Sequence, residues 1–265
     1  DMSTDSWIKL VSIIGEQYDM YDGFVILHGT DTMAYTASAL SFLLENLTKP
    51  VILTGSQLPL GQLRTDGKEN ILTSIEFNGH LLRGNRATKQ NADGFNAFDS
   101  FNYPHLCDAG VDFTFHTHHI LTPDYSKPLI VHKEMDRNVI IFSLFPGIDE
   151  NIVKHVLEAP ELRGIIMRSY GSGNAPHYPW IINELREASN RGVVVVNISQ
   201  CISGKVEMGR YDTGRQLLQA GIISGRDSTV EAAATKLMYL QGRYDDSEKI
   251  RALMAHSIAG ELTEV

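Results

Sequence analysis

Two hydroxyl groups and a carboxylate follow directly after a short apolar segment near the start of the chain. The apolar residues 24–27 precede Gly29, which is followed by Thr30, Asp31 and Thr32. A hydroxyl group can act as a nucleophile, and a carboxylate can hold an ammonium group. These side chains could therefore act on a small zwitterion.

The elements around this segment predict where the polar side chains lie. Residues 24–27 predict a strand buried on both faces, and the pattern of residues 33–46 predicts a helix. Gly29 allows a sharp turn between them. In open α/β sheets ligands bind beyond the carboxyl ends of the strands, which is the position of Thr30 and Asp31. The alternative is that Thr30 or Asp31 only caps the helix.

The same pattern repeats further along the chain. Residues 51–54 predict a second buried strand, and Gly55, Ser56 and Gln57 end it at the same edge of the sheet. Residues 66–77 predict another helix. Strand, helix, strand and helix in this order indicate parallel pairing. From residue 138 a second set of apolar strands and helices begins, including a capping box at residues 228–231 that opens a helix.

Composition excludes several classes of protein. The 265 residues carry a formal net charge of -9, which argues against nucleic acid as a partner. No apolar run approaches the length of a membrane span, and no signal peptide is recognised at the start, so we expect no membrane partner. Cys107 and Cys201 are too few for a disulfide framework and predict free thiols in a reducing compartment.

Residues 95–125 are rich in Asn, Asp, Pro and His, and we expect them to be irregular. The segment contains three histidines within residues 116–119. A structural zinc site needs four ligands in a folded frame, and no Cys or Glu stands nearby at suitable spacing. We therefore expect a surface or edge-strand histidine cluster and no metal site.

Five segments resemble motifs of the L-asparaginases, and specifically of the bacterial-type cytoplasmic (type I) members. They lie in the same order as in that family and extend over nearly the whole chain: residues 28–34, 49–57, 83–89, 168–176 and 199–206. The resemblance implies hydrolysis of L-asparagine, no cofactor, no metal, a cytoplasmic location and a homodimer or homotetramer. It also implies a two-domain α/β fold. We expect a larger N-terminal domain with a mostly parallel sheet (1–120), a linker (121–136) and a smaller C-terminal α/β domain (137–265).

The resemblance also assigns residues to the catalytic site. Amide hydrolysis requires a nucleophile and a group that accepts its proton, and a lysine whose pKa is lowered by burial can accept one. Lys89 stands far from Thr30 in sequence, so spacing alone favours a surface lysine. The resemblance implies that Thr30 is the second catalytic threonine, which Lys89 activates or which orients a water molecule. It implies that Asp31 binds the α-ammonium group and orients Lys89.

Further residues are assigned by the same resemblance. Gly29, Thr30, Asp31, Ser56 and Tyr211 would contact the substrate, although turn polarity explains Ser56 and packing explains Tyr211 equally well. Its neighbours Arg210 and Asp212 replace smaller residues of the family pattern. Three residues, namely Thr88, Arg168 and Cys201, match an effector pocket for asparagine in some members. For Cys201 the alternative is a small buried apolar residue.

The sequence departs from the family in two places. It contains no Thr-Gly-Gly-Thr loop, which carries the family's first catalytic threonine, and no strand near residues 77–78. We expect a polypeptide of these residues alone to be weak or inactive as a catalyst. Three alternatives follow: a non-catalytic amino-acid-binding or regulatory protein on the same scaffold, an asparaginase-like amidotransferase subunit, and an incomplete enzyme chain.

Overall fold

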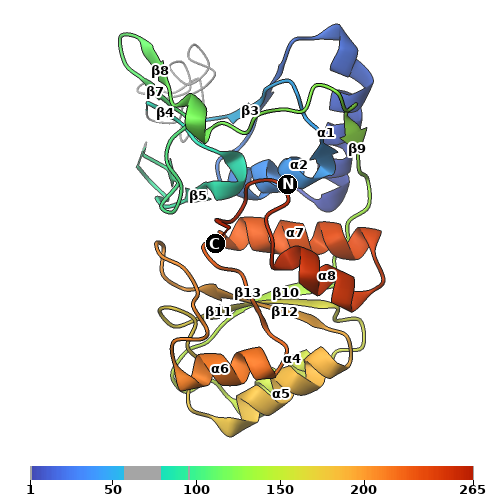
Figure 1. The fold of residues 1–265 in the computed structure, drawn as a ribbon, viewed down its shortest axis with the longest axis vertical. Helices are drawn as coiled ribbons and strands as arrows, with labels where there is room; N and C mark the ends of the chain where they lie inside the picture. Colours follow the sequence, from blue (N-terminus) through green and yellow to red (C-terminus); the bar gives the residue numbers. More distant parts are fainter. Residues whose placement is uncertain (1, 57–78, 95, 265) are drawn as a thin grey trace. The chain divides into compact units, whose positions relative to one another are not determined.

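The computed structural model describes residues 2–56, 79–94 and 96–264. The chain forms two compact units, residues 1–133 and 134–265 (Figure 1). The division falls inside the predicted linker, and the two units are nearly equal in length. The helix predicted at 66–77, the strand expected near 77–78 and Gln57 lie outside the described residues.

The first unit begins with two helical segments, and short strands, one longer helix and short helical turns follow. Its elements are α1 (Thr4–Gln17), η1 (Tyr18–Met20), β1 (Phe24–Leu27), α2 (Met33–Leu43), β2 (Leu44–Glu45), β3 (Val51–Thr54), β4 (His80–Leu81), η2 (Gly84–Arg86), β5 (Thr88–Lys89), β6 (Phe98–Asp99), β7 (Cys107–Ala109), β8 (Phe113–Phe115), η3 (Thr117–His119) and β9 (Ile130–Val131).

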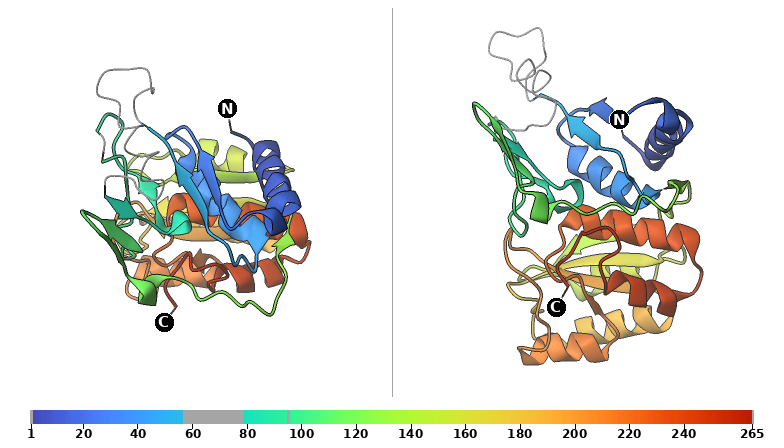
Figure 2. Two further views of the ribbon diagram at one scale, coloured as in Figure 1. Left: turned by 90° about the horizontal axis from the view of Figure 1, so that it is seen from above. Right: turned by 45° about the horizontal axis from the view of Figure 1, so that its top comes forward.

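The two strands predicted at 24–27 and 51–54 are β1 and β3, and their parallel pairing is confirmed. Leu27 pairs with Thr54, so both strands end at the same edge. The helix α2 lies along one face of the pair (Figure 2). Burial on both faces is wrong for β1: Val25 is 52% and Leu27 is 63% exposed, because no described element covers that face.

The remaining described pairs of the first unit are antiparallel. β4, β7 and β8 form one small sheet, β5 pairs with β6, and β2 pairs with β9. The prediction that residues 95–125 are irregular is therefore wrong. Strands of two or three residues are too short to show an alternating apolar pattern, and only their partners reveal them.

The second unit is a parallel sheet covered by helices. Its elements are β10 (Val139–Ser143), α4 (Glu150–Leu157), β11 (Gly164–Ser169), α5 (Pro179–Asn190), β12 (Val194–Ser199), α6 (Asp212–Gln219), β13 (Ile223–Ser224), α7 (Val230–Arg243) and α8 (Ser247–Met254).

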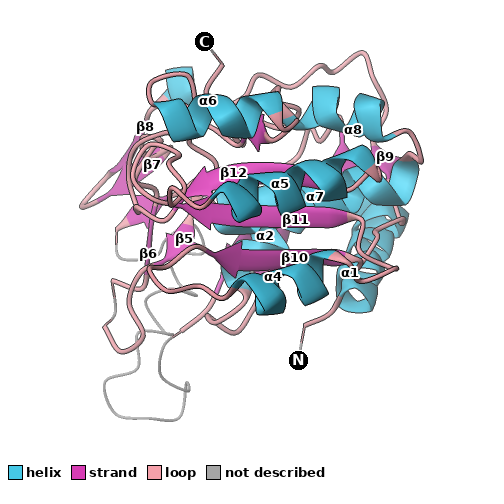
Figure 3. Ribbon diagram, turned by 90° about the horizontal axis from the view of Figure 1, so that it is seen from below, coloured by secondary structure: helices cyan, strands magenta, loops and turns pink. Residues whose placement is uncertain are grey.

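The described strands of this sheet run in the order β10–β11–β12–β13, all in parallel. Helices α4 and α5 cross one face (Figure 3), where Val153 and Leu185 pack into the core with Ile165 and Val195 of the strands. Helix α7 contacts β10 and β11, and α8 contacts β12. The central strands are buried along almost their whole length, as expected for a parallel sheet between helices.

A buried ion pair holds α7 to the segment that follows α8. The side chains of Lys236 and Glu261 are 1% and 0% exposed, and Nζ lies 2.6 Å from Oε1. Glu261 also accepts hydrogen bonds from the backbone N–H groups of Ile258 and Ala259. Burial lowers the pKa of Lys236, and Glu261 opposes that shift.

Helix α7 begins as the capping box predicted, but one residue later. The N-cap is Thr229 rather than Ser228, and its hydroxyl accepts a hydrogen bond from the N–H of Ala232.

No helix in the described part of the chain is both long and apolar enough to cross a bilayer.

Candidate active site

The loop after β1 presents two polar side chains that do not cap the following helix. The N-cap of α2 is Thr32, and its side chain makes no capping hydrogen bond. The Asp31 carboxylate instead contacts Lys89, so helix capping is the wrong interpretation for Asp31. The backbone carbonyl of Thr30 accepts a hydrogen bond from the N–H of Met33, which fixes the turn from strand to helix.

Lys89 lies beside both of these residues. Its Nζ atom is 2.9 Å from Oγ1 of Thr30 and 2.6 Å from Oδ1 of Asp31. The side chain of Lys89 is 18% exposed and that of Asp31 is 93% exposed. The interpretation of Lys89 as a surface lysine is therefore wrong. The structure brings together all three side chains that the resemblance assigned to the catalytic site.

The position of Lys89 depends on the packing of its partner strand. Lys89 on β5 pairs with Phe98 on β6, and Phe98 is buried against Met33 and Ala34 at the start of α2. The hydrophobic contact thus places the β5–β6 ribbon next to the helix start. Because side chains on adjacent strands are fixed by the register, this packing also places the amine beside Thr30.

The hydrogen bond from Lys89, together with its nearby positive charge, lowers the pKa of the Asp31 carboxyl group. Asp31 therefore stays ionised down to lower pH than an ordinary aspartate. An ionised and exposed carboxylate can bind an ammonium group of a ligand while it holds the lysine.

The end of β3 reaches the same edge of the sheet through a close backbone contact. The N–H of His28 donates to the carbonyl of Thr54 at 2.8 Å. A Cβ atom on Gly55 would lie 2.1 Å from the carbonyl oxygen of His28, so only glycine fits. Ser56 follows directly and is partly buried. A Cβ atom on Gly29, in contrast, would meet nothing within 4 Å.

The other assigned residues are distributed over both units. Thr88 lies on β5, opposite Asp99 of β6. In the second unit, Tyr211 is 47% exposed at the start of α6, with the guanidinium of Arg210 5.7 Å from its ring centre.

Arg168 lies near the end of β11, and Cys201 follows β12. Both cysteines are free, as predicted, but Cys201 is exposed, so the interpretation of a small buried residue is wrong. Its backbone N–H donates to the hydroxyl of Ser199, which itself donates to the carbonyl of Gly171.

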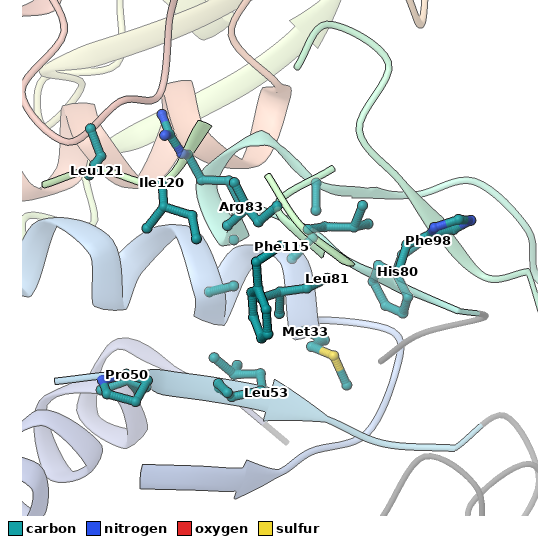
Figure 4. A pocket seen from close by; sticks show the side chains of 18 residues that line it. Met33, Pro50, Leu53, His80, Leu81, Arg83, Phe98, Phe115, Ile120 and Leu121 are labelled. Carbon is teal, nitrogen blue, oxygen red and sulfur yellow. The ribbon is translucent and has the colours of Figure 1, made fainter. Parts of the chain in front are cut away.

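A separate cavity in the first unit is apolar. It has a volume of about 560 Å³, and Figure 4 shows Met33, Leu53, Leu81 and Phe115 around it. None of the assigned polar residues lines this cavity. A zwitterion would find few polar partners there, so the cavity is not part of the candidate active site.

Comparison with known proteins decides the family. The family model "Asparaginase, N-terminal" matches residues 1–121, and "Glutaminase/Asparaginase C-terminal domain" matches residues 138–254. The chain belongs to the asparaginase family. The chain is 49% identical over 279 residues to L-asparaginase 1 of Escherichia coli K12, covering 99% of this chain and 81% of that protein.

Solved structures agree with this assignment. L-asparaginase I from Vibrio cholerae superposes with a TM-score of 0.94 at 44% identity, covering 100% of this chain and 83% of that one. The two-domain asparaginase fold is therefore confirmed. A glutamyl-tRNA(Gln) amidotransferase component from Pyrococcus horikoshii is more distant, at 32% identity with 99% of this chain and 64% of that protein covered.

Sequence reasoning missed one group of neighbouring ionisable side chains. His80, His105 and Asp108 meet in the first unit, and His116 contacts the same carboxylate. No spacing pattern connects residues 80, 105 and 108, because their proximity arises from the pairing of β4 with β7. The sequence offered only the cluster at residues 116–119 as a signal.

Proposed function

We propose that this chain hydrolyses the side-chain amide of L-asparagine to give L-aspartate and ammonia. The observation that carries the proposal is the joint hydrogen bonding of Lys89 to Thr30 and Asp31 at the carboxyl end of β1. Membership of the asparaginase family supports it, since the E. coli relative is an L-asparaginase.

Each residue has a separate role in this proposal. Asp31 binds the α-ammonium group of the substrate and orients Lys89. Thr30 either attacks the amide carbon itself or holds the attacking water. Lys89 first releases one of its own protons to solvent, and its neutral amine then receives the proton that the attacking hydroxyl loses. The carbon–nitrogen bond then breaks and ammonia leaves with that proton. Where Thr30 is the attacking group, a water molecule hydrolyses the ester that Thr30 has formed and releases L-aspartate. One water molecule is consumed for each amide, and the step needs no cofactor.

Other residues complete the proposed binding sites. Gly29 and Ser56 of the first unit contact the substrate, and the family motif assigns the same role to Tyr211 of the second unit. The family motifs assign Thr88 of the first unit, and Arg168 and Cys201 of the second unit, to binding of asparagine as an effector. Support for the first set is that Gly29 and Ser56 follow neighbouring strands at one edge of the sheet. The matching motifs support the second.

We further propose that the protein is cytoplasmic and works as a homodimer or homotetramer. The exposed apolar side chains of the second unit support self-association. Phe145, Ile152 and Val156 around α4 are 53%, 67% and 41% exposed. Such a patch loses its contact with water when a second copy covers it. Light scattering with chromatography should give a multimer, which Ile152→Glu should weaken.

Ammonia release from L-asparagine tests the proposed activity. We expect Thr30→Ala to reduce the rate at least about 100-fold, because proton transfer at the attacking hydroxyl is lost. Thr32→Ala is the matched control, since this nearby exposed threonine makes no capping hydrogen bond. Equal rates for Thr30→Ala and the unaltered protein would exclude the proposed role of Thr30.

A second candidate function is binding of an amino acid without turnover. The observation that favours it is the 93% exposure of the Asp31 side chain beside Lys89, which suits capture of an ammonium group. Calorimetry with L-asparagine separates the two functions. Heat of binding that disappears in Asp31→Asn, with no ammonia produced, would select the binding protein.

A further inference from the structure

Three histidine side chains from separate segments of the first unit converge on the carboxylate of Asp108. The register of β4 and β7 sets His80 directly opposite Asp108. His105 lies in the segment before β7. His116 follows β8, and its backbone N–H donates to the carbonyl of Leu106. The small antiparallel sheet therefore fixes the backbone from which these side chains project.

The polar atoms of this group lie at distances suited to a shared ion. Nδ1 of His80 is 2.8 Å from Oδ1 of Asp108, and Nδ1 of His105 is 3.3 Å from the same oxygen. The three ligand atoms all lie within 4.8 Å of one another. In a tetrahedral zinc site with bonds of about 2.0–2.1 Å, neighbouring ligand atoms are separated by about 3.3 Å. Only small side-chain rotations are needed to surround one ion.

We propose that His80, His105 and Asp108 form a binding site for a divalent transition-metal ion of the zinc class. Two imidazoles and one carboxylate are a ligand set that suits Zn²⁺. Ca²⁺ and Mg²⁺ prefer oxygen ligands, so the two nitrogen ligands select against them. Three protein ligands leave one coordination position for water.

Neighbouring groups hold the ligands in place. Nε2 of His116 is 2.8 Å from Oδ2 of Asp108, so it binds the carboxylate oxygen that the histidine ligands leave free. Nε2 of His105 lies 3.6 Å from Oδ1 of Asp99. Such partners around the ligands orient them and raise metal affinity.

The site is open to solvent. The side chains of His80, His105 and Asp108 are 40%, 31% and 45% exposed, so an ion has a path to its ligands. The formal net charge of -9 of the chain also favours the approach of a cation. The site does not contain Thr30, Asp31 or Lys89, and binding is therefore a property separate from the proposed hydrolysis.

Titration of the chelator-stripped protein with Zn²⁺ tests the proposal, with a chromogenic chelator as competitor. We expect one ion per chain. His105→Gln and Asp108→Asn should each weaken binding by more than about 100-fold, and His116→Gln by about 10- to 100-fold. His118→Gln is the matched control, because this neighbouring histidine is not one of the ligands; its ring is tilted against that of His119, with the ring centres 3.9 Å apart, and lies edge-on to His116 at 6.3 Å.

Two further measurements keep the test decisive. Circular dichroism of the metal-free variants shows whether they fold, and His80→Gln replaces Asp108→Asn if the latter does not. Co²⁺ bound in place of Zn²⁺ should give the visible absorption of a four- or five-coordinate ion, which His105→Gln removes. Equal Zn²⁺ affinity in the unaltered protein, His80→Gln and His105→Gln would overturn the proposal, as would the absence of binding.

Discussion

Replacement of Lys89 gives the sharpest test of the proposed chemistry. Its amine contacts Thr30 at 2.9 Å and Asp31 at 2.6 Å, so Lys89→Met removes both hydrogen bonds in one change. If the amine only orients the two side chains, the loss is that of a hydrogen bond to a charged group. This is about 1.5–3 kcal/mol, or roughly 10- to 150-fold in rate.

The loss is larger if the amine also carries the proton. General acid–base catalysis contributes about 100- to 10,000-fold, which corresponds to about 3–5 kcal/mol in the activation barrier. We expect Lys89→Met to fall in this range, with the change mainly in kcat. An interaction that acts only in the transition state lowers kcat and kcat/KM together.

Lys89→Arg separates the two roles. Arginine keeps the positive charge and the donors, but it does not release its proton and so cannot accept another. Arginine should therefore restore the orientation but leave the reaction nearly as slow as in Lys89→Met.

The assay is the initial rate of ammonia release at saturating L-asparagine, with thermal unfolding measured on each variant. Lys127→Met is the matched control, because Lys127 forms an exposed pair with Asp124 at 3.2 Å. A Lys89→Arg rate within about tenfold of the unaltered protein would refute proton transfer by Lys89, since general acid–base catalysis is worth more than that.

Three further predictions concern stability and pH. Gly55→Ala should destabilise the fold by about 1–3 kcal/mol, because the added Cβ would collide with the carbonyl of His28. Urea unfolding measures this change. The control Gly29→Ala should change the free energy of unfolding by no more than about 0.5 kcal/mol, since its Cβ would meet no neighbour. Lys236→Met should cost about 3–5 kcal/mol by leaving Glu261 buried without its cation, whereas Lys154→Met, at a surface pair, should cost less than about 1 kcal/mol. Equal urea midpoints for these two lysine variants would contradict that reasoning. The pKa of Asp31 is lower in the folded protein than in an ordinary aspartate. Its pairing with Lys89 is therefore fully present above the ordinary aspartate pKa of about 3.9, and the pairing is lost as the pH falls through the lowered pKa of the folded protein. Carbon NMR titration of the Asp31 carboxyl group should therefore show a higher pKa in Lys89→Met, and an unchanged value would disprove the stated cause.

The strands at the centre of the site could be predicted from local sequence. A run of apolar residues followed by a polar turn located β1 and β3 to the residue, because the change in polarity falls at or within one residue of the end of each strand. The same pattern did not predict the exposure of Val25 and Leu27, since exposure depends on which other elements cover a face. Local composition does not contain that information.

The position of Lys89 in the site could not be predicted from local residue patterns. Its proximity to Thr30 depends on the register of β5 with β6 and on burial of Phe98 against α2. Neither follows from local spacing, and only the family resemblance indicated the pair. The histidine group around Asp108 had no resemblance to indicate it and depends on the same kind of short-strand pairing, so it was missed.

The alignment of this chain with the E. coli relative shows that the two sequences differ by internal residues. It extends over 279 positions, 14 more than the 265 residues of this chain. The relative therefore carries residues within the matched stretch that this chain lacks. A missing strand near residues 77–78 stays a prediction, because those residues lie outside the described part.

The ion pair between Lys236 and Glu261 sets an order of events during synthesis of the second unit. The two residues stand 25 positions apart, and Lys236 comes first on the ribosome. Until Glu261 has emerged, the amine on the inner side of α7 has no carboxylate partner, and burying it alone is unfavourable. Helix α7 can form and pack against β10 and β11 before Glu261 is synthesised. Final closure of this side of the sheet must wait for the segment after α8, because that segment carries the carboxylate that pairs with Lys236.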